Sequence, residues 1–188
     1  MPCTALDPKT ALVVIDFQKG IASMAGDRIR GAVENGARLA RAFRRAKQTV
    51  VLVNVAFSAD GGDRPRGRTD APPRALPSDP SFSEIMAELA AEETDVRVTK
   101  KQPNAFYGTD LDLQLRRRGV TGIALCGVST SIGVDGTARA AHERNYNVTI
   151  ASDACADLDP AMHEAVMTKM FPRVAEVDTT DAILRHLK

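Results

Sequence analysis

Short apolar segments alternate with segments of helical periodicity along the whole chain. The apolar segments stand at residues 11–15, 49–55, 96–98, 122–126, 148–151 and 174–177. They show little polar alternation, which is typical of strands covered on both faces, as in a parallel sheet. Between them, amphipathic spacing, a capping box at Ser81-x-x-Glu84 and helix-ending residues predict helices over 28–47, 81–91, 110–118, 132–145, 160–170 and 178–187.

This alternation predicts an α/β fold. We expect a doubly wound sheet of about six mostly parallel strands with helices on both faces, formed by residues 1–188 as a single domain. In such a sheet, ligands bind beyond the carboxyl ends of the strands. The stretch 58–80 breaks the rhythm with Gly, Pro and charge. A loop this long is either functional or a solvated excursion.

The charge balance excludes several classes of partner. The formal net charge is +1 over 188 residues, which gives no electrostatic footprint for nucleic acid or for an anionic membrane. No apolar run approaches the ~20 residues that cross a bilayer, and the first residues lack the pattern of a signal peptide. Three scattered cysteines without a CxxC pair exclude a disulfide framework or a zinc knuckle and fit a reducing cytoplasm. We therefore expect a cytoplasmic protein that acts on a small molecule.

Three predicted strand ends carry groups that suit a site. Asp16 follows the first strand, Lys100 follows the third, and the segment Gly127 to Gly133 leads from the fourth strand into a helix. Successive N–H groups at such a helix start can hold an anion. Each feature also has a plain structural interpretation: a turn aspartate, an exposed lysine beside Lys101, and a helix entry. No GxGxxG or P-loop pattern is present, which disfavours nucleotide binding.

Several neighbouring residues would complete a pocket. Phe17 and Phe57 would wall an apolar space, or pack in the core. Gln18 would donate to a substrate oxygen, or satisfy the turn that carries it. Cations for an anionic substrate would come from the long loop, although solvated charge is the competing interpretation. Those cations are Arg64, Arg66, Arg68 and Arg74.

Taken together, the motifs match a known pattern in order and spacing. They are Asp16-Phe17-Gln18, then Lys100 with Phe106, Thr109 and Leu111, then Leu125 through Ala138, and finally Asn145 through Ala154. This arrangement resembles the isochorismatase-like hydrolase superfamily over about residues 10–175. Most of that superfamily resembles amidohydrolases with an Asp–Lys–Cys triad. The position of the nucleophilic Cys is Gly133 here, so the thioester route has no nucleophile.

The resemblance implies a different chemistry for this variant. Isochorismatases proper also have glycine at that position and hydrolyse a vinyl ether without a covalent thioester. The resemblance implies Asp16 as the acid, Lys100 as its orienting ammonium, and the corner of Ser129, Thr130 and Gly133 as a substrate-binding backbone, with a cis peptide before Ser129. It also implies self-association into a homo-oligomer. The Asp-x-His metal signature of nicotinamidases is absent after the second strand, so we expect no metal and no cofactor.

Three functions stay open at this point. The first is hydrolysis of a small metabolite without a thiol nucleophile, with enol-ether cleavage as its precedent. The second is small-molecule binding by a chain that has lost catalysis, and the third is nicotinamidase-like amide hydrolysis. General-acid work near neutral pH requires that burial raise the pKa of Asp16 more than Lys100 lowers it.

Overall fold

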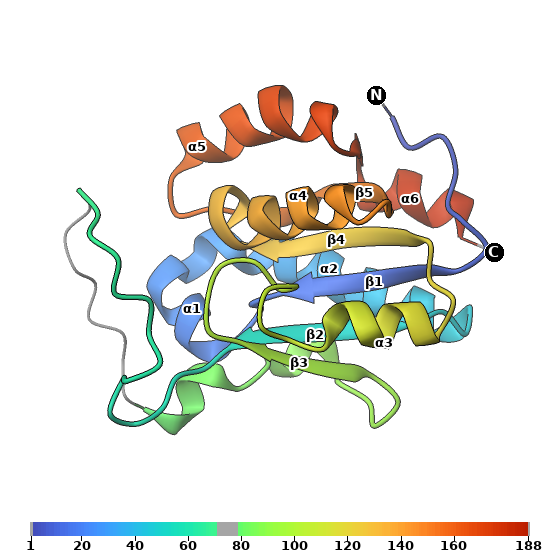
Figure 1. The fold of residues 1–188 in the computed structure, drawn as a ribbon. Coiled ribbons are helices and arrows are strands. Elements are labelled where there is room, and N and C mark those ends of the chain that lie inside the picture. Colours follow the sequence, from blue (N-terminus) through green and yellow to red (C-terminus); the bar gives the residue numbers. More distant parts are fainter. Residues whose placement is uncertain (1, 71–78, 188) are drawn as a thin grey trace.

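The centre of the molecule is an open sheet whose strands are all parallel (Figure 1). The structure is a computed structural model that describes residues 2–70 and 79–187. Within these residues the sheet has six strands in the order β3-β2-β1-β4-β5-β6. Their bounds are β1 Thr10–Ile15, β2 Val50–Val55, β3 Val96–Lys100, β4 Gly122–Val128, β5 Asn147–Ala156 and β6 Glu176–Asp178.

Helices cover both faces of this sheet, as the alternation of elements predicts. Helices α2 and α6 pack on one face, with α2 in contact with four strands, and α3 and α4 lie on the other face (Figure 1). Helix α5 packs on the turn η4. The helices are α1 Lys19–Ala25, α2 Arg30–Arg45, α3 Leu111–Arg117, α4 Asp135–Glu143, α5 Pro160–Ala165 and α6 Thr180–His186. The short turns are η1 Gly26–Ile29, η2 Pro80–Ser83, η3 Ala87–Leu89, η4 Thr130–Val134, η5 Val166–Met170 and η6 Phe171–Arg173.

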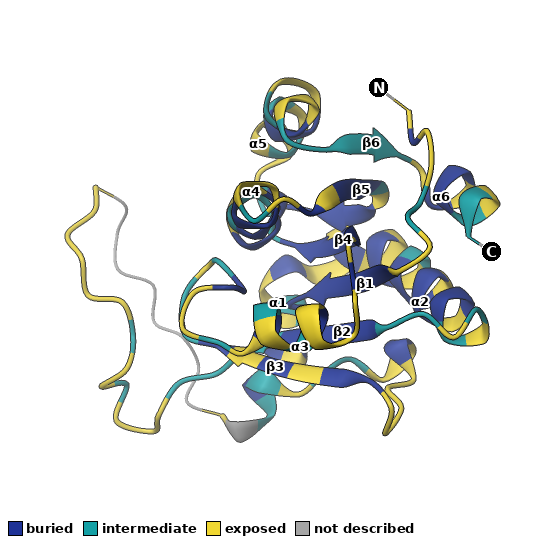
Figure 2. Cartoon of the chain, turned by 45° about the vertical axis from the view of Figure 1, so that its right-hand side comes forward, coloured by how far each residue is buried: buried dark blue, intermediate teal, exposed yellow. Residues whose placement is uncertain are grey.

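The central strands are buried along their whole length. Every residue of β1 and of β4 is buried, whereas the edge strand β3 alternates between buried and exposed positions (Figure 2). The buried set in β3 is Val96, Val98 and Lys100, because successive side chains of a strand point to opposite faces. Because the side chains of β3 alternate between its two faces, Lys100 points inward and the next residue, Lys101, lies nearer the solvent.

The order of the strands reverses between β1 and β4. The chain moves outward from β1 to β2 and β3, then returns to pair β4 with the other side of β1. A doubly wound sheet opens a crevice at such a switch point, beyond the carboxyl ends of its strands. Asp16 follows β1 at this place, and the turn η4 follows β4. The topology thus brings two of the expected site segments side by side.

One predicted helix is wrong, and one helix of the structure was not predicted. Residues 81–91 do not form a helix: the turns η2 and η3 flank a segment whose backbone pairs with the end of the Asp16 loop, through Lys19 N to Glu84 O at 2.8 Å and Met86 N to Phe17 O at 3.0 Å. The capping-box pattern was misleading because these external partners satisfy the backbone. Helix α1 was not predicted, since glycine and serine in Lys19–Ala25 weaken its helical signal.

The long loop is described in part. Residues 58–70 are irregular, as expected, whereas Arg74 lies outside the described residues. No helix within residues 2–70 and 79–187 is long and apolar enough to cross a membrane.

Candidate active site

Asp16 stands at the carboxyl end of β1 in an unusual backbone conformation. Its φ is +54°, a left-handed region that aspartate tolerates better than most residues. The residue is 5% exposed, and its Oδ2 accepts a hydrogen bond from Lys100 Nζ at 2.7 Å. Its second oxygen, Oδ1, is buried and has no hydrogen-bond partner among the described residues. An unpaired buried acceptor is costly, so Oδ1 is the atom of this site that is free to meet a ligand.

Lys100 is the buried member of the lysine pair. Its side chain is 2% exposed, and its ammonium also donates to the carbonyl oxygen of Pro103 at 2.9 Å. Lys101 points away and pairs with Asp63 at 2.8 Å, with both side chains partly exposed. The interpretation of two solvated lysines is therefore wrong for Lys100. Its four-carbon stem carries the charge from β3 past the end of β2 to the acid on β1.

Gly133 lies directly beside the acid. It sits in η4, and a Cβ placed on it would lie 3.3 Å from Asp16 Oδ2 and 3.0 Å from Ile15 Cγ2. The side chain of any other residue here would therefore begin next to the carboxylate. The peptide bond between Val128 and Ser129, which leads into this corner, is cis, as the resemblance implied.

Burial decides the acidity of Asp16. Removal of the carboxylate from water raises its pKa from 3.8 to about 6, although the charge and the hydrogen bond of Lys100 act in the opposite direction. About one tenth of Asp16 is therefore protonated at pH 7, and about one half at pH 6. A carboxyl group with this pKa is suited to general-acid catalysis.

The chain itself occupies several backbone amides of the corner. Asp157 is buried at the end of β5, and its Oδ2 accepts hydrogen bonds from both the N–H and the Oγ of Ser131, each at 2.7 Å. The half-buried Ser129 accepts the N–H groups of Ile132 and Val134 with its carbonyl oxygen, at 3.1 and 3.2 Å. These three amides are therefore not available to a substrate oxygen. Any anion recognition by the corner falls to its remaining groups.

Two further residues brace the corner and were missed from the sequence. The buried hydroxyl of Thr130 lies 2.9 Å from His163 Nδ1, which brings a histidine of α5 to the site. Asp157 was not singled out either. It follows the fifth apolar segment by a few residues, as Asp16 follows the first, and this position after a strand is the signal that could have found it.

Phe17 and Gln18 serve the fold and do not face a pocket. Phe17 is fully buried and packs against α2, where a Cβ on Gly36 would come within 2.6 Å of its ring. The amide of Gln18 donates to the carbonyl oxygens of Val55 and Phe82 at 3.0 and 2.8 Å and accepts the N–H of Val55 at 2.7 Å. Both of its donors are used. The core interpretation of Phe17 and the turn interpretation of Gln18 therefore replace substrate binding.

Phe57 remains on the accessible side of the strand ends. It is half-buried, and the guanidinium of Arg64 lies 5.2 Å from the centre of its ring. This cation–π contact holds one of the loop arginines beside an apolar ring. Arg66 and Arg68 are exposed.

The thiols are inert by burial. Cys3, Cys126 and Cys155 are free and buried, and desolvation raises the pKa of each thiol, to about 12 for Cys155. The sulfur of Cys126 would lie 3.7 Å from a Cβ on Gly36 of α2, which places it under that helix. A raised pKa keeps a thiol in its unreactive form at neutral pH.

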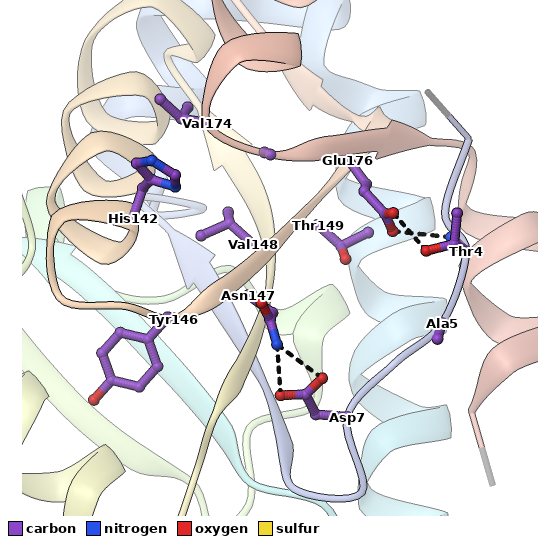
Figure 3. Close-up of a pocket in the computed structure, with 11 residues that line it drawn as sticks. Thr4, Ala5, Asp7, His142, Tyr146, Asn147, Val148, Thr149, Val174 and Glu176 are labelled. Carbon is purple, nitrogen blue, oxygen red and sulfur yellow. Dashed lines mark hydrogen bonds between the residues drawn. The ribbon is translucent and has the colours of Figure 1, made fainter.

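A separate pocket lies at the amino ends of β5 and β6. Its cavity volume is about 420 Å³, and its lining includes the N-terminal segment and the start of β5 (Figure 3). The polar groups in it bond to one another: Asn147 donates to both oxygens of Asp7 at 3.1 and 3.0 Å, and Thr4 N donates to Glu176 at 2.9 Å. These bonds tie the N-terminal segment to the sheet. Asp16, Lys100 and Gly133 lie at the carboxyl ends of β1, β3 and β4.

Nothing in the described part of the chain gathers three or more His, Cys, Asp or Glu side chains that could hold a metal ion. The expectation of a metal-free site stays a prediction.

The chain matches known proteins over nearly its whole length. The family model of the isochorismatase domain matches residues 10–182. The uncharacterized isochorismatase family protein YecD of Escherichia coli O157:H7 is 43% identical over 180 residues, which cover 95% of this chain and 96% of that protein. A solved structure of an isochorismatase family protein from Burkholderia thailandensis has a TM-score of 0.93 at 40% identity and covers 97% of both chains.

More distant relatives have names that point to two kinds of chemistry. The phenazine biosynthesis protein PhzD1 of Pseudomonas aeruginosa is 29% identical over 183 residues, 96% of this chain and 87% of that protein. The ureidoacrylate amidohydrolase RutB of Variovorax paradoxus is 25% identical over 202 residues, 94% of this chain and 80% of that protein. The match of the domain model and the shared fold place this chain in the isochorismatase family of hydrolases.

Proposed function

We propose that this hydrolase cleaves the enol ether of a small anionic metabolite of the isochorismate type, with Asp16 as general acid and without a thiol nucleophile. The observation that carries the proposal is the juxtaposition of a buried acid with a position that has no side chain. Asp16 Oδ1 has no hydrogen-bond partner among the described residues, and Gly133 places no side chain beside the carboxyl group, where even a Cβ would lie 3.0 Å from Ile15 Cγ2. A relative named as a phenazine biosynthesis protein is 29% identical over 87% of its length, which supports work on a small metabolite.

The reaction balances with one proton and one water molecule. The protonated Asp16 gives its proton to the methylene carbon of the enol ether, which leaves an oxocarbenium ion at the carbon that bears the ether oxygen. Water adds to that carbon and releases a proton, which returns to the carboxylate. The hemiketal then breaks its bond to the ring oxygen, and pyruvate and a ring alcohol leave. A pKa of about 6 leaves enough of the acid form for this step.

Lys100 supports both partners of the reaction. An ammonium has three donors, and two of them meet Asp16 Oδ2 and the carbonyl oxygen of Pro103. The third is available to a substrate carboxylate. After the proton transfer the same ammonium stabilises the carboxylate that Asp16 becomes. Arg64, held against Phe57, supplies a second cation for an anionic substrate.

Amide hydrolysis through a thioester is disfavoured by the same geometry. Gly133 offers no nucleophile where the triad would need one, and the three thiols are buried with raised pKa values. The hydroxyl of Ser131 bonds to Asp157, and no histidine contacts it among the described hydrogen bonds. The chain resembles an amidohydrolase in fold and lacks the group on which that reaction depends.

The test is release of pyruvate from isochorismate by the purified protein. Asp16→Asn should lower kcat/KM by at least ~100-fold, the lower range of general acid–base contributions, while keeping the size of the side chain. Asp27→Asn is the matched control, because Asp27 is exposed and pairs only with Arg30 in the adjoining helix. Equal activity of wild type and Asp16→Asn would overturn the proposal.

A second outcome would favour the binding-protein alternative. If isochorismate and related enol ethers raise the melting temperature of the protein but release no pyruvate, the site has kept its fold and lost its catalysis. We also expect the chain to act in the cytoplasm as a homo-oligomer, which light scattering of the purified protein would test.

A further inference from the structure

One buried hydroxyl joins the two halves of the site. Thr137 lies on α4, four residues after Gly133, and is fully buried. Its Oγ1 donates to the carbonyl oxygen of Gly133 at 2.7 Å and accepts the backbone N–H of Ala105 at 3.1 Å. The first bond is the usual contact of a helical threonine with the preceding turn. The second is not required by a helix and reaches a separate segment of the chain.

That segment is the loop that holds Lys100. The loop follows β3, and its Pro103 accepts a hydrogen bond from Lys100 Nζ at 2.9 Å. Two residues later, Ala105 is fully buried and donates to Thr137. The loop lies directly against the start of α4, where a Cβ on Gly136 would be 3.7 Å from the backbone nitrogen of Asn104.

These contacts close a ring around the acid. The ring runs from Asp16 to Lys100, through the loop to Ala105, across the hydroxyl of Thr137 to Gly133, and back to Asp16 at the position a Cβ would occupy. The Asp16–Lys100 bond joins two side chains, and the bonds of Lys100 to Pro103 and of Thr137 to Ala105 and Gly133 join a side chain to the backbone. Removal of the hydroxyl would leave a buried N–H without its acceptor, and the loop would shift to satisfy it.

We infer that Thr137 is a positioning residue whose hydroxyl fixes the Lys100 loop against the Gly133 corner and thereby sets the geometry of the Asp16–Lys100 pair. It touches neither the substrate nor the acid. Its effect passes through the placement of the ammonium. The inference deepens the proposed function, and the kinetic part of its test rests on that function.

The experiment compares three threonine substitutions. Thr137→Val removes the hydroxyl and keeps the shape of the side chain, whereas Thr137→Ser keeps the hydroxyl. Thr10→Val is the matched control, because Thr10 is also buried and also donates to a backbone carbonyl, that of Asp7 at 2.8 Å, but at the amino end of β1, away from the site. We expect Thr137→Val to lower kcat/KM by roughly 10- to 100-fold, as a misplacement of about 1 Å does, and the other two variants to stay near wild type.

A second readout does not need a substrate. Lys100 is the charged side chain that lowers the pKa of Asp16, so a displaced ammonium lets that pKa rise. Carbon-13 NMR of the Asp16 carboxyl, assigned by its loss in Asp16→Asn, should show a higher titration midpoint in Thr137→Val and an unchanged midpoint in Thr137→Ser and Thr10→Val. If the titration midpoint of Asp16 rises in Thr137→Val but the wild type releases no pyruvate, the proposed function is refuted and the inference about Thr137 stands.

The inference fails if Thr137→Val titrates and turns over like Thr10→Val. If Thr137→Val does not fold, amide hydrogen exchange of the wild type decides. The N–H of Ala105 should be protected to the level of the central strands, and fast exchange at Ala105 would overturn the inference.

Discussion

The pH dependence of turnover follows from which form of Asp16 is active. The proposed reaction needs the protonated carboxyl, and burial raises the pKa of that carboxyl to about 6. The rate should therefore fall as pH rises through about 6. The protonated fraction is roughly one half at pH 6, about one tenth at pH 7 and about one hundredth at pH 8, so kcat/KM should fall about tenfold per pH unit on this limb.

Substitution of Lys100 tests whether the pKa of Asp16 sets this fall in rate with rising pH. The charge and hydrogen bond of Lys100 lower the pKa of Asp16, so Lys100→Met should move the midpoint above that of wild type while reducing the maximal rate. Lys101→Met is the matched control, because the partly exposed Lys101 pairs with Asp63 and does not contact Asp16. Its midpoint should equal that of wild type.

The assay is pyruvate release, measured in quenched samples with lactate dehydrogenase so that the coupling enzyme always works at one pH. A rate that rises through pH 6 would show that the carboxylate acts as a base, which would refute the general-acid role. A midpoint that falls in Lys100→Met would refute the balance of burial and charge.

Three further predictions concern the same site. Gly133→Ala places a methyl group 3.3 Å from Asp16 Oδ2 and 3.0 Å from Ile15 Cγ2, so kcat/KM should fall by about 100-fold. The ~0.5–1 kcal/mol gained on leaving glycine offsets only part of the ~1–3 kcal/mol cost of overpacking, so the melting temperature should also fall, for a net cost of up to ~2.5 kcal/mol. Iodoacetamide should leave turnover intact because the thiols are buried with raised pKa values, and loss of activity at stoichiometric labelling would restore a thiol mechanism. Burial raises the pKa of Asp16 from 3.8 in the unfolded chain to about 6 in the folded chain. The stability that Asp16 contributes is therefore complete below pH 3.8 and is lost as pH rises to about 6, a change of about 3 kcal/mol. Urea titrations of the wild type should show this change, and those of Asp16→Asn should lack it.

The hydrophobic pattern predicted the sheet because burial on both faces leaves an uninterrupted apolar segment. The strands at 11–15 and 122–126 correspond to the fully buried β1 and β4. The motif spacing placed Asp16, Lys100 and Gly133 together, and the structure brings them within contact distance. The inward direction of Lys100 follows from the alternation of β3, which the weak pattern Val96-Arg97-Val98 already contained.

What the pattern did not predict depends on contacts between distant segments. Residues 81–91 do not form the predicted helix because their backbone forms hydrogen bonds with residues 17–19. No local sequence signal predicts this pairing. The residue types of Phe17 and Gln18 suit a pocket and the core equally well, so the sequence does not show which of the two these side chains face. Only the packing of α2 and the bonds to Val55 and Phe82 decide their roles.

The ammonium that tunes the acid stands on the outermost strand of the sheet. Strand β3 has a neighbour on one side only, and every second residue of it faces outward. Such borders open at lower free energy than the interior. Opening of β3 would move the Lys100 ammonium away from Asp16 and raise the pKa of that carboxyl. The pKa of Asp16 thus depends on the rigidity of the edge strand β3. A molecule that docks along β3 can therefore change the rate of the reaction.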